Sequence, residues 1–208
     1  MFGTRNLADE TGAVVKLAGK NRFLLVLFLL FFFGVVYGAL VISQGSRQLM
    51  DTLSFMTDNF LSLRSEQSLL QTFFRSFGMH LGMMAVLYVM GFSAISQPVS
   101  LFIPAFYGLG FGLSVGYLYS SMGAKAILVT AVIILPHAMI STVALILAVR
   151  ESVRLSNLFL AGFVPKLTGS VSLKAVKLYS VKYLILLLFM LLASFVDGVF
   201  TFLFARFF

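Results

Sequence analysis

The chain has 208 residues, of which 60% are hydrophobic and 11% are charged, and its mean hydropathy is +1.04. Soluble domains carry about 25% charged and about 45–50% apolar residues, so this composition excludes a soluble globular protein and predicts an integral membrane protein. The formal net charge of +8 indicates membrane topology and contact with anionic lipid rather than nucleic-acid binding. The chain has no cysteine, which excludes disulfides and thiol chemistry.

Five segments are long and apolar enough to cross a bilayer, which takes about 20 consecutive residues. In chain order they are residues 23–42, 76–96, 101–121, 126–149 and 184–205. The first is longer than the apolar region of a signal peptide, so we expect an uncleaved anchor. The connection at residues 96–99 is short enough to make the second and third spans a tight helical hairpin. The predicted fold class is therefore all-α, a polytopic integral membrane protein with one membrane domain over residues 1–208.

Two connecting segments are long enough to have structure of their own. Residues 46–75 predict an amphipathic outer segment, because apolar side chains recur at helical steps: Leu49, Leu53, Met56, Phe60 and Leu63. Residues 150–182 form a basic inner segment. Its end, residues 171–182, is expected to be a separate basic helix on the inner leaflet after a break at Pro165 and Gly169. These segments add amphipathic interfacial helices to the five spans.

The basic residues orient the spans. One group precedes the first span: Arg5, Lys16, Lys20 and Arg22. The other lies between the fourth and fifth spans: Arg150, Arg154, Lys166, Lys174, Lys177 and Lys182. Five spans put both groups on one side, which the positive-inside rule makes cytoplasmic. The N-terminus is expected inside and the C-terminus outside.

Glycines recur at four-residue spacing in the first three spans. The stretch GLGFGLSVG, residues 108–116, could be read as a phosphate-binding loop, but such a loop needs a strand before it and an amphipathic helix after it. Its apolar flanks instead favour a helix face for close backbone packing in lipid, with contact to a lumen or ligand as the alternative. The predicted helix-packing residues are Gly34, Gly38, Gly78, Gly82, Gly108, Gly112 and Gly116.

Three ionisable residues lie inside the predicted spans, where they are costly and often functional. His80 falls near the outer end of the second span, where it could simply hydrogen-bond in the interface. His137 follows Pro136, so a neutral imidazole could satisfy the carbonyl that the proline frees, or a group on another helix. Asp197 precedes Gly198 and could pair with a histidine or cap a helix break at the glycine. A proton relay would require all three residues to lie near one another around a water-filled path.

No enzyme signature is present in the sequence. It has no H-E-x-x-H zinc motif, no G-x-S-x-G nucleophile elbow, no Walker A motif and no paired intramembrane aspartates. Two histidines on separate spans, without cysteine, are a thin basis for a metal site. We therefore expect no catalytic, metal-binding or cofactor-binding residues, and no cofactor.

Residues 88–140 carry an ordered set of motifs that resembles the stage II sporulation protein M family. That family has a G-x-S-x-x-x-x-P hairpin, a glycine-rich span with G-F-x-x-G-Y/F, a turn with glycine, and an L-P motif in the next span. The corresponding residues here are Gly91, Ser93 and Pro98; Gly110, Phe111, Gly112, Gly116 and Tyr117; Gly123; and Leu135 and Pro136. The family often has Gln-Asn after that proline, where this chain has His137 and Ala138. The first span also looks like the family's first span.

The resemblance implies a membrane protein of endospore-forming bacteria, on the mother-cell side of the sporulation septum. It would be a non-enzymatic scaffold that localises two peptidoglycan hydrolases, sporulation proteins D and P, during engulfment of the forespore. The alternative is a small-solute transporter or permease subunit that uses the intramembrane aspartate and histidines, although no inverted repeat is visible. An intramembrane enzyme is the third reading.

Overall fold

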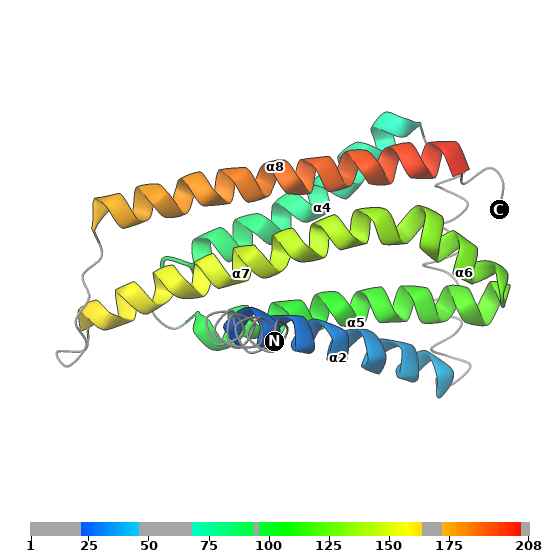
Figure 1. Ribbon diagram of the computed structural model, residues 1–208, viewed down its shortest axis with the longest axis horizontal. Coiled ribbons are helices and arrows are strands. Elements are labelled where there is room, and N and C mark those ends of the chain that lie inside the picture. The colour runs from blue at the N-terminus through cyan, green and yellow to red at the C-terminus, as the bar shows by residue number, and fades with distance from the viewer. Residues whose placement is uncertain (1–21, 46–67, 94–95, 164–171, 205–208) are drawn as a thin grey trace, which may run out of the picture.

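The computed structural model describes residues 22–45, 68–93, 96–163 and 172–204, all essentially helical (Figure 1). The helices are α2 (Arg22–Ser43), α4 (Leu69–Met90), α5 (Gln97–Met122), α6 (Lys125–Val129), the π-helical turn η1 (Thr130–Ile134), α7 (Leu135–Phe163) and α8 (Leu173–Phe204). Because α6, η1 and α7 are continuous, these residues contain five helical segments long and apolar enough to cross a membrane. This confirms the predicted all-α polytopic fold class.

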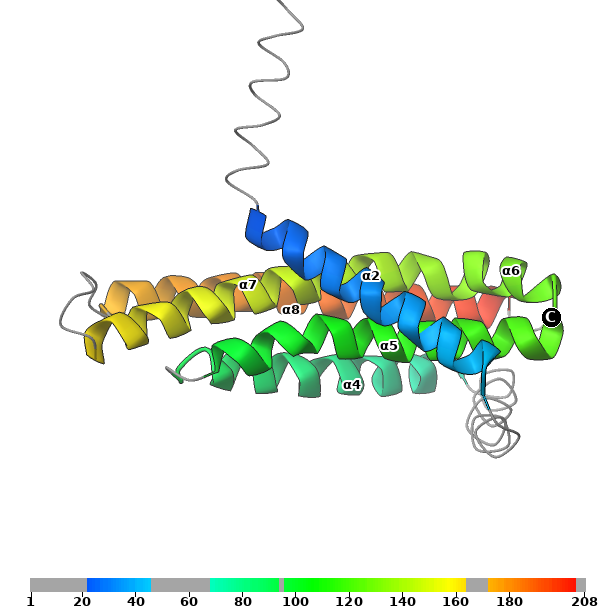
Figure 2. The ribbon, with the colours of Figure 1, turned by 90° about the horizontal axis from the view of Figure 1, so that it is seen from below.

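Helix α7 lies at the centre of the bundle, with α4 and α8 on one side and α2 and α5 on the other (Figure 1). It is the most buried of the spans, and its apolar residues Leu145 and Val149 are fully buried. Leu87 of α4 and Met190 of α8 belong to the same core. Helix α2 crosses the bundle obliquely and packs chiefly on α5 (Figure 2).

Helices α4, α7 and α8 extend well beyond the predicted spans, and α7 continues to Phe163 instead of ending near 149. Helix α4 also ends at Met90, earlier than the predicted end at 96. Helix α4 begins at Leu69 rather than 76, because Ser68 caps it by accepting a hydrogen bond from the backbone N–H of Gln71 at 3.3 Å. Helix α8 begins at Leu173 and continues without a break into the fifth span, so residues 173–182 are not the separate inner helix that was expected. The predicted outer segment lies largely at residues 46–67, outside the described residues, as do residues 164–171.

Glycines bring α2 and α5 into backbone contact. A Cβ atom added at Gly108 would collide with the carbonyl oxygen of Phe31, and one at Gly34 would collide with that of Ala105. Gly38 and Gly112 have equally close backbone neighbours, and a Cβ at Gly116 would lie 3.3 Å from the side chain of Ile42. No hydrophobic force draws helices together inside lipid, so this close approach is a main source of their association.

The two glycines predicted to pack in the second span differ from the others. Gly78 and Gly82 are exposed on α4, and a Cβ at either position would have no neighbour within 4 Å among the described residues. Helix α4 packs on α8 through larger side chains on its opposite face, including His80 and Met84. Four-residue spacing therefore marks a packing face in α2 and α5 but not in α4.

The end of α4 is closed by side chains from α7 and α8. The last carbonyls of a helix are short of partners within that helix; in α4 the backbone N–H of Gly91 bonds to the carbonyls of both Leu87 and Tyr88, and each carbonyl has a second lone pair to satisfy. Here the carbonyl of Leu87 accepts from the hydroxyl of Ser152 at 2.9 Å, and the carbonyl of Tyr88 accepts from the hydroxyl of Tyr179 at 3.0 Å. Gly91 follows, and a Cβ there would collide with the Tyr179 hydroxyl. The first glycine of the hairpin motif thus makes room for this hydrogen bond.

A π-helical turn lies directly before Pro136. The backbone N–H of Leu135 bonds to the carbonyl of Thr130, five residues back. Proline cannot donate a backbone hydrogen bond, and its ring collides with the carbonyl one turn earlier in a regular helix. The wider turn relieves that collision, and α6 is set at an angle to α7 (Figure 1).

Candidate functional site: a buried polar cluster

Asp197 of α8 and His137 of α7 form an ion-pair contact inside the bundle. The Asp197 side chain is 1% exposed, and its Oδ1 lies 3.4 Å from Nδ1 of His137. The same nitrogen lies 3.3 Å from the carbonyl oxygen of Ile133. A proton on Nδ1 therefore has both the carboxylate and a backbone carbonyl as acceptors. Helix α8 continues through Gly198, so Asp197 pairs with a histidine rather than capping a helix break.

His80 of α4 contacts the same helix, one turn from Asp197. Its Nδ1 lies 3.1 Å from the hydroxyl oxygen of Ser194, and Ser194 can donate its own proton to the carbonyl of Met190 at 2.9 Å. The hydroxyl therefore links His80 to the backbone of α8, and the tautomer of the ring sets the direction of the bond to His80. His80 lies in the middle of α4, buried, instead of at the outer interface as predicted, because α4 begins earlier than expected.

A tyrosine and a second serine complete the group. The hydroxyls of Tyr107 on α5 and Ser141 on α7 are 2.8 Å apart. Ser141 is also 3.2 Å from the carbonyl of Ala138, and either hydroxyl can be the donor in the bond between Tyr107 and Ser141. Tyr107 lies within electrostatic range of Asp197, and His80 within that of both Asp197 and His137. We call the full set the polar cluster: His80, Tyr107, His137, Ser141, Ser194 and Asp197.

The chemistry of the polar cluster is that of proton sharing. A carboxylate and an imidazole in contact can hold a proton between them, and the low dielectric of the bundle makes their mutual attraction strong. Ser141 and Ser194 can both donate to backbone carbonyls of their own helices, which is a structural role. A nucleophilic serine instead donates its proton to its base. Among the described residues, no group of three His, Asp or Glu side chains could hold a metal ion.

The sequence indicated three members of this cluster and missed the other three. His80, His137 and Asp197 stand out because they are ionisable residues in apolar spans. Ser194 could have been inferred from its position one turn before Asp197 on the same helix face, and Ser141 from its position one turn after His137. Tyr107 carries no such signal, because its partner lies on another helix.

The fold and the polar cluster together define a class: a polytopic, all-helical membrane protein with a buried polar centre. Within that class, the chain belongs to the stage II sporulation protein M (SpoIIM) family, whose model matches residues 27–202. The match runs from α2 to α8 and confirms the resemblance of the sequence motifs. Family membership makes this a sporulation-related membrane protein. No curated protein and no solved structure matches the chain.

Proposed function

We propose that this protein is a non-enzymatic scaffold in the bacterial cell membrane that localises septal peptidoglycan hydrolases during engulfment of the forespore. The partners would be sporulation proteins D and P, and the protein would act on the mother-cell side of the septum. The N-terminus would be cytoplasmic and the C-terminus outside, as the basic residues predict. The observation that carries the proposal is the family match over residues 27–202.

The packing of the bundle supports a structural role. Helix–helix contacts are made by glycine backbones in α2 and α5, by hydroxyl groups at the end of α4 and by the apolar core around α7. Each of these holds the helices in a fixed arrangement. A fixed arrangement suits a protein whose task is to present surfaces to membrane-embedded partners.

The polar cluster favours a second candidate, a proton-linked transporter or permease subunit. His80, His137 and Asp197 come from three helices and lie within electrostatic range of one another. That proximity is one condition for a proton relay through the span, and a water-filled path is the other.

Affinity capture distinguishes the two candidates. The tagged full-length protein would be isolated in mild detergent from membranes of sporulating cells, with a control capture from vegetative cells that express it ectopically. Recovery of sporulation proteins D and P supports the scaffold. Recovery of an ATPase without the hydrolases would contradict it in favour of a permease.

A paired substitution tests the role of the polar cluster. Asp197→Asn alone leaves His137 able to gain and lose a proton, so the single variant does not remove every proton-exchanging group of this pair. The double variant Asp197→Asn with His137→Gln keeps two hydrogen-bonding amides and removes both titratable groups. A scaffold should support engulfment with this variant, measured by membrane-dye microscopy beside a blot for protein level. A block in engulfment, despite normal protein level and normal hydrolase localisation, would refute a passive scaffold.

A further inference from the structure

Helices α7 and α8 project past the apolar span at one end of the bundle. Residues 126–149, in α6, η1 and α7, contain no Lys, Arg, Asp or Glu, and this uncharged stretch ends at Arg150 and Glu151. In α8, Lys182 is the last basic residue before the apolar part of the helix. We call this the basic end. The described residues 150–163 and 172–182 contain one acidic residue, Glu151, and five basic ones: Arg150, Arg154, Lys174, Lys177 and Lys182.

An α-helix rises 1.5 Å per residue, so the 32 residues of α8 span about 48 Å, more than the ~30 Å hydrocarbon core. Lys182 and Glu151 therefore lie at the level of lipid headgroups.

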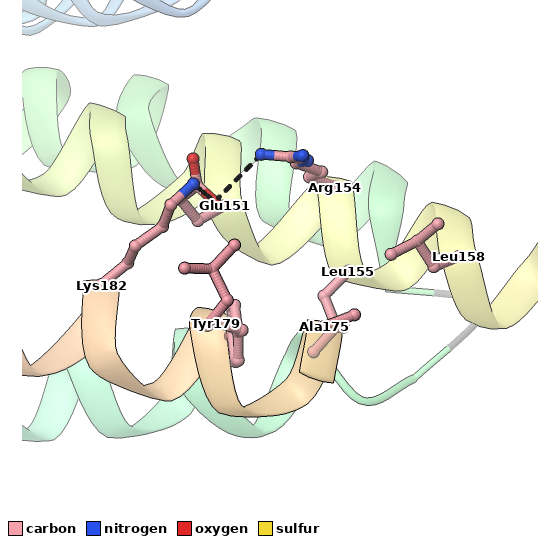
Figure 3. Close-up of a pocket in the computed structure, with 8 residues that line it drawn as sticks. Glu151, Arg154, Leu155, Leu158, Ala175, Tyr179 and Lys182 are labelled. Carbon is pink, nitrogen blue, oxygen red and sulfur yellow. Dashed lines mark hydrogen bonds and ion pairs between the residues drawn. The ribbon is translucent and has the colours of Figure 1, made fainter. Parts of the chain in front are cut away.

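A small pocket opens between the two helices at this level (Figure 3). Its volume is about 50 Å³, and its charged side is formed by Glu151, Arg154 and Lys182. Nζ of Lys182 lies 2.8 Å from Oε2 of Glu151, and Nη1 of Arg154 lies 3.9 Å from the same oxygen. One carboxylate is thus shared by two cations, and the Arg154 side chain is 63% exposed.

The rest of the pocket is lined by Tyr179 and by apolar side chains. These are Leu155 and Leu158 of α7 and Ala175 and Leu178 of α8. Leu178 is half exposed, at 52%, so this wall continues onto the outer surface of the bundle. The pocket therefore presents cations beside an apolar strip that opens toward the surrounding lipid.

We propose that this pocket binds an anionic phospholipid, with the phosphate at Arg154 and Lys182 and the start of an acyl chain along Leu155, Leu158 and Leu178. The excess of basic residues around the pocket complements a negative headgroup. The apolar wall explains why the ligand is a lipid rather than a soluble phosphate compound. In the orientation that the basic residues predict, the lipid belongs to the inner leaflet. The Glu151 carboxylate contacts the same two cations, Arg154 and Lys182, and so competes with the phosphate and lowers its affinity.

Lipid binding to the purified full-length protein tests this proposal. The thermal midpoint in neutral detergent would be measured against added phosphatidylglycerol or phosphatidylcholine, with native mass spectrometry to count retained lipids. A ligand that binds only the folded protein raises its midpoint, so phosphatidylglycerol should stabilise the wild type and phosphatidylcholine should not. Glycerol phosphate, which has the headgroup phosphate without acyl chains, should also have no effect.

Three variants separate binding from folding, because each lipid-induced shift is compared with the same variant without lipid. A basic residue near an anionic surface contributes about 1 kcal/mol, or about fivefold in affinity, so Arg154→Gln should weaken phosphatidylglycerol binding about fivefold. Glu151→Gln should strengthen it by a similar factor, because it frees both cations. Lys177→Gln is the matched control: it removes one charge from an exposed residue that does not line the pocket.

The two charge variants must move in opposite directions. If Glu151→Gln and Arg154→Gln both weaken binding, the pair is merely structural and the proposal is wrong. It is equally wrong if Lys177→Gln weakens binding as much as Arg154→Gln does. Stabilisation by glycerol phosphate equal to that by phosphatidylglycerol would also overturn it, because the acyl chain would then make no contribution.

Discussion

Substituting Gly112 tests how closely α2 and α5 approach each other. A Cβ at this position would collide with the carbonyl oxygen of Val35 and lie 2.9 Å from its Cα, whereas ordinary contact begins at 3.4 Å. The carbonyl oxygen is the closer obstacle, so the helices would have to separate by about 1 Å even for Gly112→Ala, and a gap of that size forfeits about half of the attraction between the atoms lining it. The obstacle is backbone, which cannot rotate away. We therefore expect a loss of about 1–3 kcal/mol for alanine, the range for an overpacked interior, and more for leucine.

Gly110 provides the matched control on the same helix. A Cβ there would meet no atom within 4 Å among the described residues, so Gly110→Ala should be neutral or slightly stabilising, since alanine favours the helix. The measurement is reversible unfolding in mixed micelles, together with the folded fraction from detergent extracts. Equal stabilities for Gly112→Ala and Gly110→Ala would refute the close approach of α2 and α5.

Three further substitutions test other parts of the bundle. Gly91→Ala should lower the amount of folded protein, because its methyl group would displace the Tyr179 hydroxyl; Gly78→Ala, at an open position, should leave that amount unchanged in the same blot. Tyr179→Phe should cost about 0.5–1.5 kcal/mol of unfolding free energy, since it removes one hydrogen bond from the Tyr88 carbonyl, which keeps the backbone N–H of Gly91; an unchanged stability would contradict that contact. Asp197→Asn alone should destabilise by about 1–2 kcal/mol, because the contact with His137 loses its charge while a neutral imidazole leaves no unpaired charge behind, and an unchanged stability would argue against that pairing with His137.

The spans could be predicted from the sequence because membrane crossing depends on composition and length. Charged residues bound most of the apolar runs, but none separates the second run from the third, and there α4 ends at Met90, before the predicted end at 96. The helix ends were less predictable. Residues 69–75 resemble a surface helix, with an amphipathic pattern and Arg75, yet they continue α4 from its cap at Ser68. An amphipathic pattern shows which side of a helix is apolar, but it does not show at which residue the helix begins.

Contacts between helices could not be predicted, because they depend on how each helix is rotated. The spacing of Gly78 and Gly82 is the same as that of Gly34 and Gly38, but only the second pair meets another backbone. Helix α4 instead buries His80 and other side chains on its opposite face. The same rotation brings His80 to Ser194, a contact 114 positions apart in the chain. A single sequence shows which glycines and ionisable residues stand out in the apolar spans, but it does not show which of them are in contact in the folded bundle.

The π-helical turn before Pro136 has a consequence for the register of the chain. Val129, Ile133 and Ala138 are all buried in one group with Leu118 of α5. Ile133 and Ala138 are five residues apart, and in a regular α-helix that spacing would turn Ala138 about 140° away from the face of Ile133. The extra residue in the wide turn restores the alignment. Deleting one residue from 130–134 would give a straighter helix with α6 rotated by about 100°, so that Val129 no longer faces Leu118. The length of this stretch, and not only its composition, is therefore under structural constraint, and a one-residue deletion here should do more harm than a conservative substitution at any of the same five positions.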